Sequence, residues 1–308
     1  MNFSLLTDGF ASDSEYVFGL ANKHRYTAVE IATCNWCGDP PIDMDELISS
    51  AVAREHLKES LKRHNLTICA LNCSGNQLAP GERGRSHAEN VLKTFRCAEK
   101  LGVQKIVMMS GLPGGGPKDE YSNWVVASWP EETQEILNYQ WEVTLAYWEK
   151  TVRQAKECGI QKIALENHPY QMVYNVETLL KLRNAVDPLI GMNVDPSHCF
   201  WMGGDPIMML RALGPAIHHI HAKDARIEPY VAGINGLLES KPIDYCATRA
   251  WNYATVGYGH GLGWWKRFFA EAQIMGYDGA VSVEIEDKTM SSEIALKKAT
   301  EILRQAVI

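Results

Sequence analysis

Two kinds of segment are missing from this 308-residue chain, namely long apolar runs and clusters of basic residues. No apolar stretch is long enough to span a membrane, and residues 1–8 lack the basic region and apolar core of a secretion signal. The formal net charge is −7 and Lys and Arg do not cluster, which argues against a nucleic-acid-binding surface. We therefore expect a cytoplasmic protein that binds neither membranes nor nucleic acid.

Cysteine patterns typical of disulfide scaffolds and of zinc sites are also missing. The eight cysteines are scattered through a chain too long to need a disulfide framework. Cys34 and Cys37 form a Cys-x-x-Cys motif, but residues 38–41 (Gly-Asp-Pro-Pro) follow where a redox motif would begin a helix. No second Cys-x-x-Cys completes a zinc site, so we expect reduced thiols.

What the chain does contain is a repeated unit: an amphipathic helical stretch, a glycine, and a short apolar strand that ends in polar residues. The glycine ends each helix in a left-handed turn that other residues adopt only at a cost. Each strand then needs a helical crossover to reach a parallel neighbour. The unit is clearest at four glycines: Gly102, Gly159, Gly214 and Gly276.

The remaining apolar segments raise the number of predicted strands to eight. They cover residues 3–7, 28–32, 68–72, 103–110, 160–166, 190–194, 217–221 and 280–284. Helices are predicted at residues 14–24, 44–64, 84–101, 131–158, 176–186, 205–213, 263–275 and 291–306. This order predicts an α/β fold, a single-domain (β/α)8 TIM barrel over residues 1–308. A doubly wound sheet is the alternative, but no Gly-rich turn follows the first strand.

Two predicted loops are longer than closing a barrel requires. The loop after strand four contains residues 111–117 (Gly-Leu-Pro-Gly-Gly-Gly-Pro) and then Trp124. The loop after strand seven, residues 225–261, contains Trp251, Tyr253, Tyr258 and His260. Because such loops lie on the active-site face of a barrel, we expect them to wall a small substrate, with Trp124 and His260 as substrate contacts. Packing against a partner subunit is the alternative.

Potential metal ligands end four consecutive predicted strands: Glu166, Asp195, His221 and Glu284. The ends of parallel barrel strands lie on one rim, so we expect these side chains to converge. Three carboxylates and one imidazole suit Mn²⁺, with Mg²⁺, Co²⁺ and Zn²⁺ as alternatives. Each residue alone would be explained as a helix cap or as the partner of a basic side chain. Four in succession predict a site for one divalent ion.

Further polar side chains border this predicted metal site. His198 and His168 each lie within three residues of a predicted ligand. Glu30 ends the second strand, where it would hydrogen-bond either a substrate hydroxyl or a histidine beside the metal. Lys223 follows the seventh strand. We expect His198, Glu30 and Lys223 to contact the substrate.

Five short segments carry a family resemblance: residues 164–168 (Ala-Leu-Glu-Asn-His), 193–198 (Asn-Val-Asp-Pro-Ser-His), 219–224 (His-Ile-His-Ala-Lys-Asp), 256–259 (Val-Gly-Tyr-Gly) and 282–284 (Ser-Val-Glu). Together they resemble the sugar phosphate isomerase/epimerase branch of the xylose-isomerase-like TIM-barrel superfamily. The resemblance implies that the four predicted ligands bind one divalent ion, usually manganese. It also implies that Glu166 and Glu284 flank the substrate, that His198 contacts it, and that the turn at residues 257–259 shapes the pocket.

The superfamily also contains endonuclease IV, which binds three zinc ions. Its further zinc ligands include His at the ends of strands three and four and an Asp-x-His after strand seven. At these places the present chain has residues 71–73 (Leu-Asn-Cys), 108–110 (Met-Met-Ser) and 224–226 (Asp-Ala-Arg). The difference argues against a trinuclear site and against DNA repair.

The predicted site is suited to removing a proton from a carbon next to a carbonyl. An ion that holds the carbonyl oxygen stabilises the enediolate, and Glu166 and Glu284 on opposite faces of the substrate would invert a carbon centre. We therefore expect a metal-dependent isomerase or epimerase of a ketose or oxo-sugar. Residues 257–263 are Gly-rich before a helix, which indicates either an anion site or a tight turn.

Two other functions stay open. One is a lyase that eliminates a group β to the carbonyl of an oxo-sugar, the reaction of the superfamily's inosose dehydratases and C-glycoside deglycosidases, with His168 as an additional base. The other is a non-catalytic scaffold that a metal stabilises. A homo-oligomer is expected, and the aromatic loops would also permit a second, small subunit.

Overall fold

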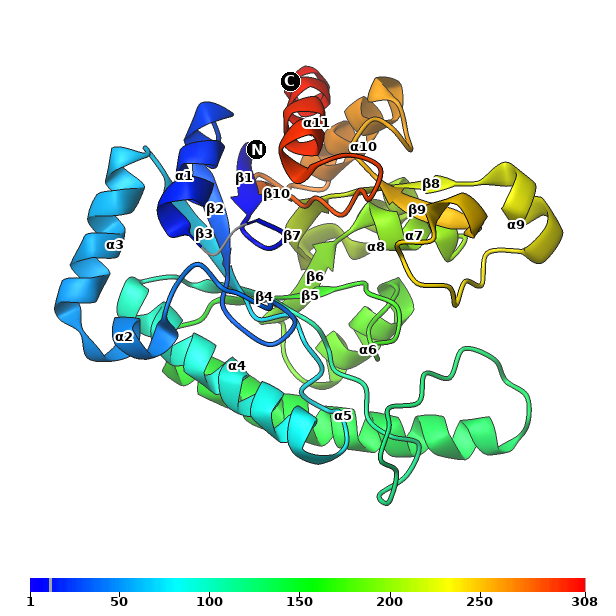
Figure 1. The fold of residues 1–308 in the computed structure, drawn as a ribbon. Helices are drawn as coiled ribbons and strands as arrows, with labels where there is room; N and C mark the ends of the chain where they lie inside the picture. The colour runs from blue at the N-terminus through cyan, green and yellow to red at the C-terminus, as the bar shows by residue number, and fades with distance from the viewer. Residues whose placement is uncertain (11–12, 308) are drawn as a thin grey trace.

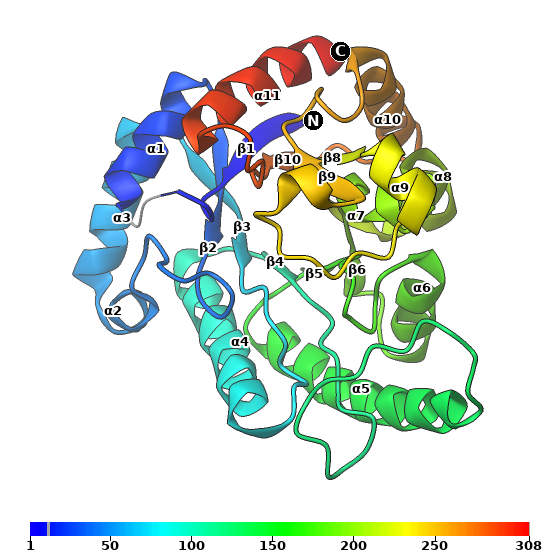
Figure 2. The same cartoon turned by 45° about the vertical axis from the view of Figure 1, so that its right-hand side comes forward.

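Eight parallel strands close into a barrel in the computed structural model, which describes residues 1–10 and 13–307. Their order around the barrel is β1-β10-β7-β6-β5-β4-β3-β2, and helices surround them (Figures 1 and 2). The strands are β1 (Asn2–Leu6), β2 (Ala28–Ala32), β3 (Thr67–Asn72), β4 (Lys105–Met108), β5 (Lys162–Glu166), β6 (Ile190–Val194), β7 (Ile217–Ala222) and β10 (Ala280–Val283). This architecture confirms the predicted (β/α)8 barrel.

The predicted helical segments lie close to their predicted bounds, and the structure adds two short helices, α7 and α9, that were not predicted. The helices are α1 (Ser14–Lys23), α2 (Met44–Ser49), α3 (Ala51–Arg63), α4 (Gly81–Leu101), α5 (Glu132–Glu157), α6 (Val176–Ala185), α7 (Pro196–Trp201), α8 (Pro206–Leu213), α9 (Pro229–Asn235), α10 (Leu262–Ile274) and α11 (Ser292–Ala306). Within the described residues, none of these helices is long and apolar enough to cross a membrane.

The single helix predicted over residues 44–64 is two helices in the structure. Ser50 has an extended backbone, with φ −109° and ψ 117°, and it separates α2 from α3. Its hydroxyl accepts a hydrogen bond from the amide of Ala53, so Ser50 caps the second helix. The apolar spacing continues across this break, which is why periodicity alone did not reveal it.

The strands place apolar side chains under the helices and polar ones inside the barrel. On β2, Val29 and Ile31 belong to the main apolar core, whereas Glu30 between them contacts histidines of β7 through the barrel interior. Ser4 and Ser282 hydrogen-bond each other at 2.7 Å between β1 and β10. The inward positions of the strands therefore include these polar side chains as well as a small apolar cluster of Ala70, Val107 and Ala164 on β3, β4 and β5.

The two long loops follow β4 and β7, as predicted, and the second contains elements of its own. β8 (Asp224–Ile227) and β9 (Trp251–Ala254) pair in an antiparallel hairpin, and α9 lies between them in the sequence. Figure 1 shows this hairpin and α9 beside α7. Trp251 stacks on Trp201 of α7 with ring centroids 4.7 Å apart, which anchors the hairpin to the barrel.

Candidate metal centre and active site

The four predicted ligands meet at one rim of the barrel. Glu166 is the last residue of β5, Asp195 follows β6, His221 lies near the end of β7 and Glu284 follows β10. One ligand atom from each lies within 4.8 Å of the corresponding atoms of the other three. The convergence follows from the topology, because β5, β6, β7 and β10 are consecutive around the barrel.

Asp195 is held by the start of a helix. Its Oδ1 accepts a hydrogen bond from the amide of Ser197 at 2.8 Å, and Pro196 occupies the first turn of α7. The segment after β6 is therefore a capped helix and not an open loop. His198 lies one turn into this helix, which brings its Nε2 to 3.0 Å from Glu166 Oε1 and 3.1 Å from Asp195 Oδ2.

Three buried atoms of the cluster form no hydrogen bond of normal geometry among the residues that the structure describes: Asp195 Oδ2, His221 Nδ1 and Glu284 Oε2. Each nevertheless lies close to another polar atom of the site, at 3.1 Å for Asp195 Oδ2 and His198 Nε2 and at 2.8 Å for His221 Nδ1 and Glu284 Oε2. An unpaired buried acceptor is costly, and three that face one another fit a bound cation. The imidazole nitrogen and three carboxylates also form a donor set that divalent transition metals accept. The residues therefore fit one divalent ion held by Glu166, Asp195, His221 and Glu284.

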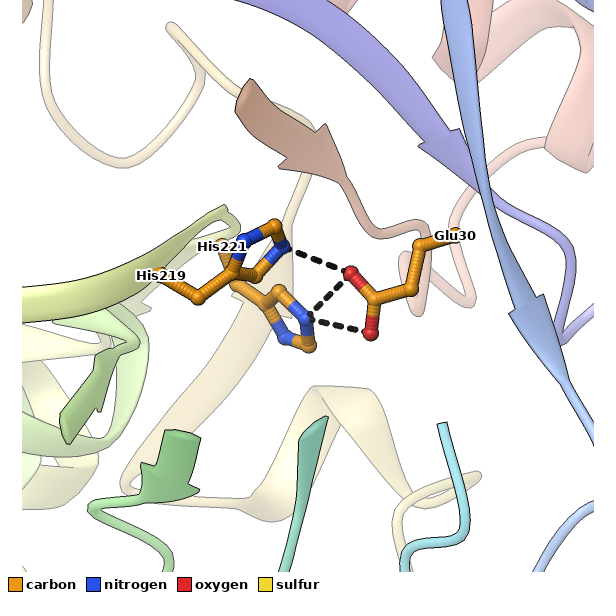
Figure 3. A group of neighbouring side chains, drawn as sticks. All are labelled: Glu30, His219 and His221. Atoms are coloured by element: carbon orange, nitrogen blue, oxygen red, sulfur yellow. Dashed lines mark hydrogen bonds and ion pairs between the residues drawn. The ribbon is translucent and has the colours of Figure 1, made fainter. Parts of the chain in front are cut away.

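A second cluster shares His221 with the first and consists of Glu30, His219 and His221 (Figure 3). Nε2 of His221 lies 3.1 Å from both oxygens of Glu30, and Nε2 of His219 lies 2.8 Å from Oε2. Asn72 donates to the other oxygen at 2.7 Å. Because these atoms satisfy one another, this cluster is a hydrogen-bond network. Glu30 is fully buried, and its carboxylate pairs with the two histidines of β7.

The protonation states in the site are set by close pairs of opposite charge. Burial would raise the pKa of Glu166, but His198 and His221 hold it well below its usual range. Burial would lower the pKa of His198, but the neighbouring carboxylates of Asp195 and Glu166 raise it to about 9. Burial and the neighbouring charge of His198 lower the pKa of His168 to about 4.

Lys223 and His168 join the four ligands and His198. Nζ of Lys223 is 2.7 Å from Glu284 Oε1 and 3.9 Å from Asp195 Oδ2, and this side chain is only 3% exposed. The ring of His168 lies 4.5 Å from that of His198. The structure thus gathers the ligands, both flanking histidines and the lysine at one rim, with Glu30 beneath them.

Two predicted substrate contacts lie further out. Trp124 packs edge-on against Tyr174, with ring centroids 5.5 Å apart. His260 stacks on Phe200 at 3.6 Å, and its Nδ1 lies 2.8 Å from Asp224. Both are on the long loops of the active-site face, but their contacts are with neighbouring loop and helix side chains. Their role in binding substrate stays a prediction.

Three more residues reach the site: Tyr253, which belongs to the loop that the sequence predicted to wall the substrate, and Trp36 and Glu286, which the sequence analysis did not identify. The hydroxyl of Tyr253 lies 3.1 Å from Nδ1 of His198, and its ring lies 4.4 Å from Nζ of Lys223. Trp36 packs 5.5 Å from the ring of His168. Glu286 pairs with Lys223 at 2.5 Å. The alternation of β10 was the available signal for Glu286, which is two residues beyond Glu284.

Comparison with protein families identifies the class of this protein. The family described as Xylose isomerase-like TIM barrel matches residues 18–306, so the chain belongs to that family. The membership confirms the resemblance seen in the five sequence segments. Members of this kind are mostly enzymes that modify sugars, which agrees with the coarse function expected from the sequence.

Individual relatives extend the comparison. The chain is 49% identical over 311 residues to the uncharacterized protein YfiH of Bacillus subtilis (strain 168), covering 100% of this chain and 99% of that protein. It is 27% identical over 206 residues to an inosose dehydratase of Geobacillus kaustophilus (strain HTA426), covering 66% and 63%. The crystal structure of the IolI protein with bound zinc matches with a TM-score of 0.67 at 20% identity, covering 99% and 98%, which shows a shared fold.

Proposed function

We propose that this protein is a divalent-metal-dependent isomerase or epimerase that removes a proton from the carbon next to the carbonyl of a ketose or oxo-sugar. The observation that carries the proposal is the convergence of two carboxylates on one imidazole. Glu166 Oε2 and Glu284 Oε2 lie 3.3 and 2.8 Å from Nδ1 of His221. They reach this point from β5 and β10, which are separated by two strands of the barrel.

We assign the metal to Glu166, Asp195, His221 and Glu284, with manganese as the proposed ion. When bound, a divalent ion supplies positive charge that stabilises negative charge developing on substrate oxygens. Glu166 and Glu284 are the proposed catalytic residues. One carboxylate accepts the proton from the substrate carbon and the other returns a proton from the opposite face, which inverts the centre. A positioned base of this kind contributes on the order of 10²–10⁴-fold.

Other side chains bind and orient the substrate in this proposal. The ring of His198 is held in place by the hydroxyl of Tyr253, which lies 3.1 Å from its Nδ1. Lys223 keeps its charge because Glu284 and Glu286 outweigh burial and raise its pKa well above the usual range. Both side chains stand beside the carboxylates proposed to remove the proton. The Lys223 ammonium is placed to hydrogen-bond a substrate oxygen, and the ring of His198 is placed to contact the substrate.

A lyase is the second candidate, because the chain is 27% identical to an inosose dehydratase over 206 residues. The same proton removal would then be followed by loss of a group β to the carbonyl. His168 is the proposed additional base, since its ring lies 4.5 Å from that of His198 and belongs to the loop directly after Glu166.

Solvent deuterium distinguishes the two reactions. The manganese-loaded protein is incubated in D₂O with ketoses, inososes and 3-oxo-glycosides, and products are followed by NMR and ultraviolet absorption. Deuterium at the carbon next to the carbonyl, in recovered or epimerised sugar, supports the isomerase. A new conjugated, ultraviolet-absorbing product supports the lyase. If neither appears with any of the three substrate classes, the proposed proton removal is wrong.

The scaffold alternative is tested by Glu284→Gln. In an enzyme this change reduces both metal affinity and turnover, because a ligand and a base are lost together. A scaffold would lose metal and stability with no turnover to lose. The control is Glu271→Gln, since Glu271 is a buried carboxylate paired with Arg211 at 2.8 Å, far along α10 from the site.

We also propose a reducing cytoplasmic location and a homo-oligomer, with a second small subunit as the alternative. All eight cysteines are free thiols, which supports a reducing compartment. Tyr230, Ile234 and Leu238, on and after α9, are 81%, 67% and 84% exposed, and such apolar side chains favour a partner surface. Light scattering of the purified protein tests the oligomer.

A further inference from the structure

A line of polar contacts leads from the candidate metal centre toward the other end of the barrel. His219 and His221 are two residues apart on β7, so both point into the barrel, where Figure 3 shows them at the carboxylate of Glu30. Nε2 of His219 lies 2.8 Å from Oε2 of Glu30, and the other ring nitrogen, Nδ1, lies 3.2 Å from Nζ of Lys105. The line therefore begins at a lysine and ends at a proposed metal ligand.

Lys105 belongs to the end of the barrel opposite the proposed metal ligands. It is the first residue of β4 and pairs in register with Lys162, the first residue of β5. The ligand Glu166 is the last residue of β5. Residues at the Lys105 end of a TIM barrel generally contribute to stability and not to the active site. Apart from its charge, a side chain there acts on the metal centre only through the residues between them.

The two contacts of His219 select the same proton position on its ring. An ionised carboxylate only accepts hydrogen bonds, and an ammonium only donates them. Glu30 therefore requires a proton on Nε2, and Lys105 requires an unprotonated Nδ1. The hydroxyl of Ser282 lies 2.8 Å from the same Nε2. Lys105 thus directs the proton of this fully buried ring toward Glu30.

His219 in this form is one of three side chains that donate to the Glu30 carboxylate. Asn72 donates to Oε1 at 2.7 Å, and Nε2 of His221 lies 3.1 Å from both oxygens. Without Lys105, Nδ1 of His219 can carry the proton instead. Glu30 would then lose a donor and face an unprotonated nitrogen that repels it, so the carboxylate would turn. The orientation of the His221 ring would change with it.

We propose that Lys105 is a positioning residue for the candidate metal centre and that it acts through His219 and Glu30. This inference rests on the proposed function, because it concerns the metal of the same site. The proposal also fixes the sign of the effect. By charge alone, loss of the lysine would strengthen metal binding, since the ammonium and the ion repel each other. Loss of positioning weakens metal binding.

Lys105→Met tests the inference, because methionine has a similar length but neither the charge nor the donor. Competition with a chromophoric chelator measures the Mn²⁺ dissociation constant. We expect it to rise about 3- to 10-fold, less than for loss of a direct partner of a metal-bound histidine. The electronic spectrum of the Co²⁺-loaded variant should differ from that of the wild type. A purely structural role would lower the Tm of the metal-free protein and leave this spectrum unchanged.

Lys162→Met is the matched control. Lys162 occupies the same register position on the neighbouring strand, but its side chain is exposed. The substitution removes a positive charge from the same end of the barrel and leaves the contacts of His219 intact. Its metal affinity should therefore equal or exceed that of the wild type.

A double-mutant cycle with Glu30→Gln tests the route. If Lys105 acts through Glu30, Lys105→Met should change metal affinity by less than about 2-fold in the Glu30→Gln background. Additive losses would mean that Lys105 acts by another route, which would overturn the proposal. Unchanged or stronger metal binding in Lys105→Met alone would overturn it as well.

The proton position on His219 is measured in the metal-free protein from the ¹⁵N chemical shifts of its ring. The wild type is expected to carry the proton on Nε2, and Lys105→Met is expected to show a mixture of both forms. A wild-type ring with the proton on Nδ1 would contradict the proposal, even if no variant folds. This measurement needs neither metal nor turnover, so failure of the proposed function would appear separately, in the deuterium experiment.

Discussion

Glu30 and His221 face each other in the barrel interior, with Nε2 of His221 3.1 Å from both carboxylate oxygens. The other ring nitrogen, Nδ1, faces Glu166 and Glu284 and has no hydrogen-bond partner within the described part of the chain. A carboxylate at Nε2 keeps the proton on that nitrogen, which leaves the lone pair of Nδ1 directed at the metal centre. The buried Glu30 therefore orients the one imidazole among the four proposed metal ligands.

Glu30→Gln is expected to weaken metal binding about 10- to 100-fold, because a neutral amide no longer fixes the ring or raises its basicity. Competition with a chromophoric chelator measures the dissociation constant directly. The electronic spectrum of the Co²⁺-loaded protein should change at the same time, since the ligand geometry around the ion changes.

Glu271→Gln is the matched control for this substitution. It also neutralises a buried carboxylate, but one whose partner is Arg211 outside the barrel. Its metal affinity should equal that of the wild type. An unchanged affinity in Glu30→Gln itself would mean that Glu30 has no role in positioning His221.

Tyr253→Phe removes the hydroxyl that lies 3.1 Å from His198 and keeps the ring over Lys223. We expect kcat/KM to fall by up to about 10-fold, as for loss of one hydrogen bond, with metal affinity unchanged. Turnover with the sugar found in the deuterium experiment measures the effect. Tyr26→Phe is the control, because that hydroxyl bonds Thr300 at 2.7 Å and Tyr26 precedes the start of β2, at the end of the barrel opposite the site. An equal loss of metal affinity would show that Tyr253 instead supports the metal cluster.

The barrel and the four-residue cluster could be predicted because each depends on local pattern and on topology alone. A polar residue at the end of a buried strand is visible in sequence, as for Glu166 and Glu284. Once the strands are parallel and consecutive, their ends must share a rim. No tertiary detail was needed to bring those residues within reach of one ion.

The surroundings of the cluster could not be predicted in the same way. Tyr253 reaches His198 because β8 and β9 fold back as a hairpin, and Trp251 of that hairpin stacks on Trp201 of α7. His260 turns to Asp224 because the glycines beside it allow the backbone to close. Such contacts are set by packing between distant segments, for which the sequence has no periodic signal.

Gly191→Ala is expected to destabilise the barrel. A Cβ at Gly191 on β6 would lie 2.3 Å from Cγ of His218 on the neighbouring β7, so one of the two strands must shift. Overpacking of this kind costs about 1–3 kcal/mol. Urea unfolding followed by circular dichroism measures the loss.

Gly233→Ala is the control for this change. Gly233 lies in α9, and a methyl group added there would have no atom of the described residues within 4 Å. Alanine at this position should therefore be neutral or stabilise by roughly 0.5–1 kcal/mol. Equal stability of Gly191→Ala and the wild type would show that His218 moves aside without cost.

Glu15 links α1 to α3 and should make part of the stability depend on pH. Hydrogen bonds from Ser60 and His64, with Arg63 nearby, lower its pKa from 4.5 to about 2. A lowered carboxyl pKa stabilises the folded state above the unfolded value, and this contribution is lost as the pH falls from about 4.5 to about 2. Because the side chain is 49% exposed, solvent screening limits the contribution to about 1 kcal/mol or less.

The test of this linkage compares the wild type with Glu15→Gln. The difference in unfolding free energy between them should be largest at about pH 6 and should shrink toward about pH 3. At low pH the Glu15 carboxyl of the wild type becomes protonated and loses the negative charge that the Gln variant lacks at every pH. Urea midpoints at each pH measure the difference. Glu55→Gln, an exposed change in the same helix α3, should show no such trend. A constant difference across this range would mean that the contacts of Glu15 stabilise the protein without depending on its charge.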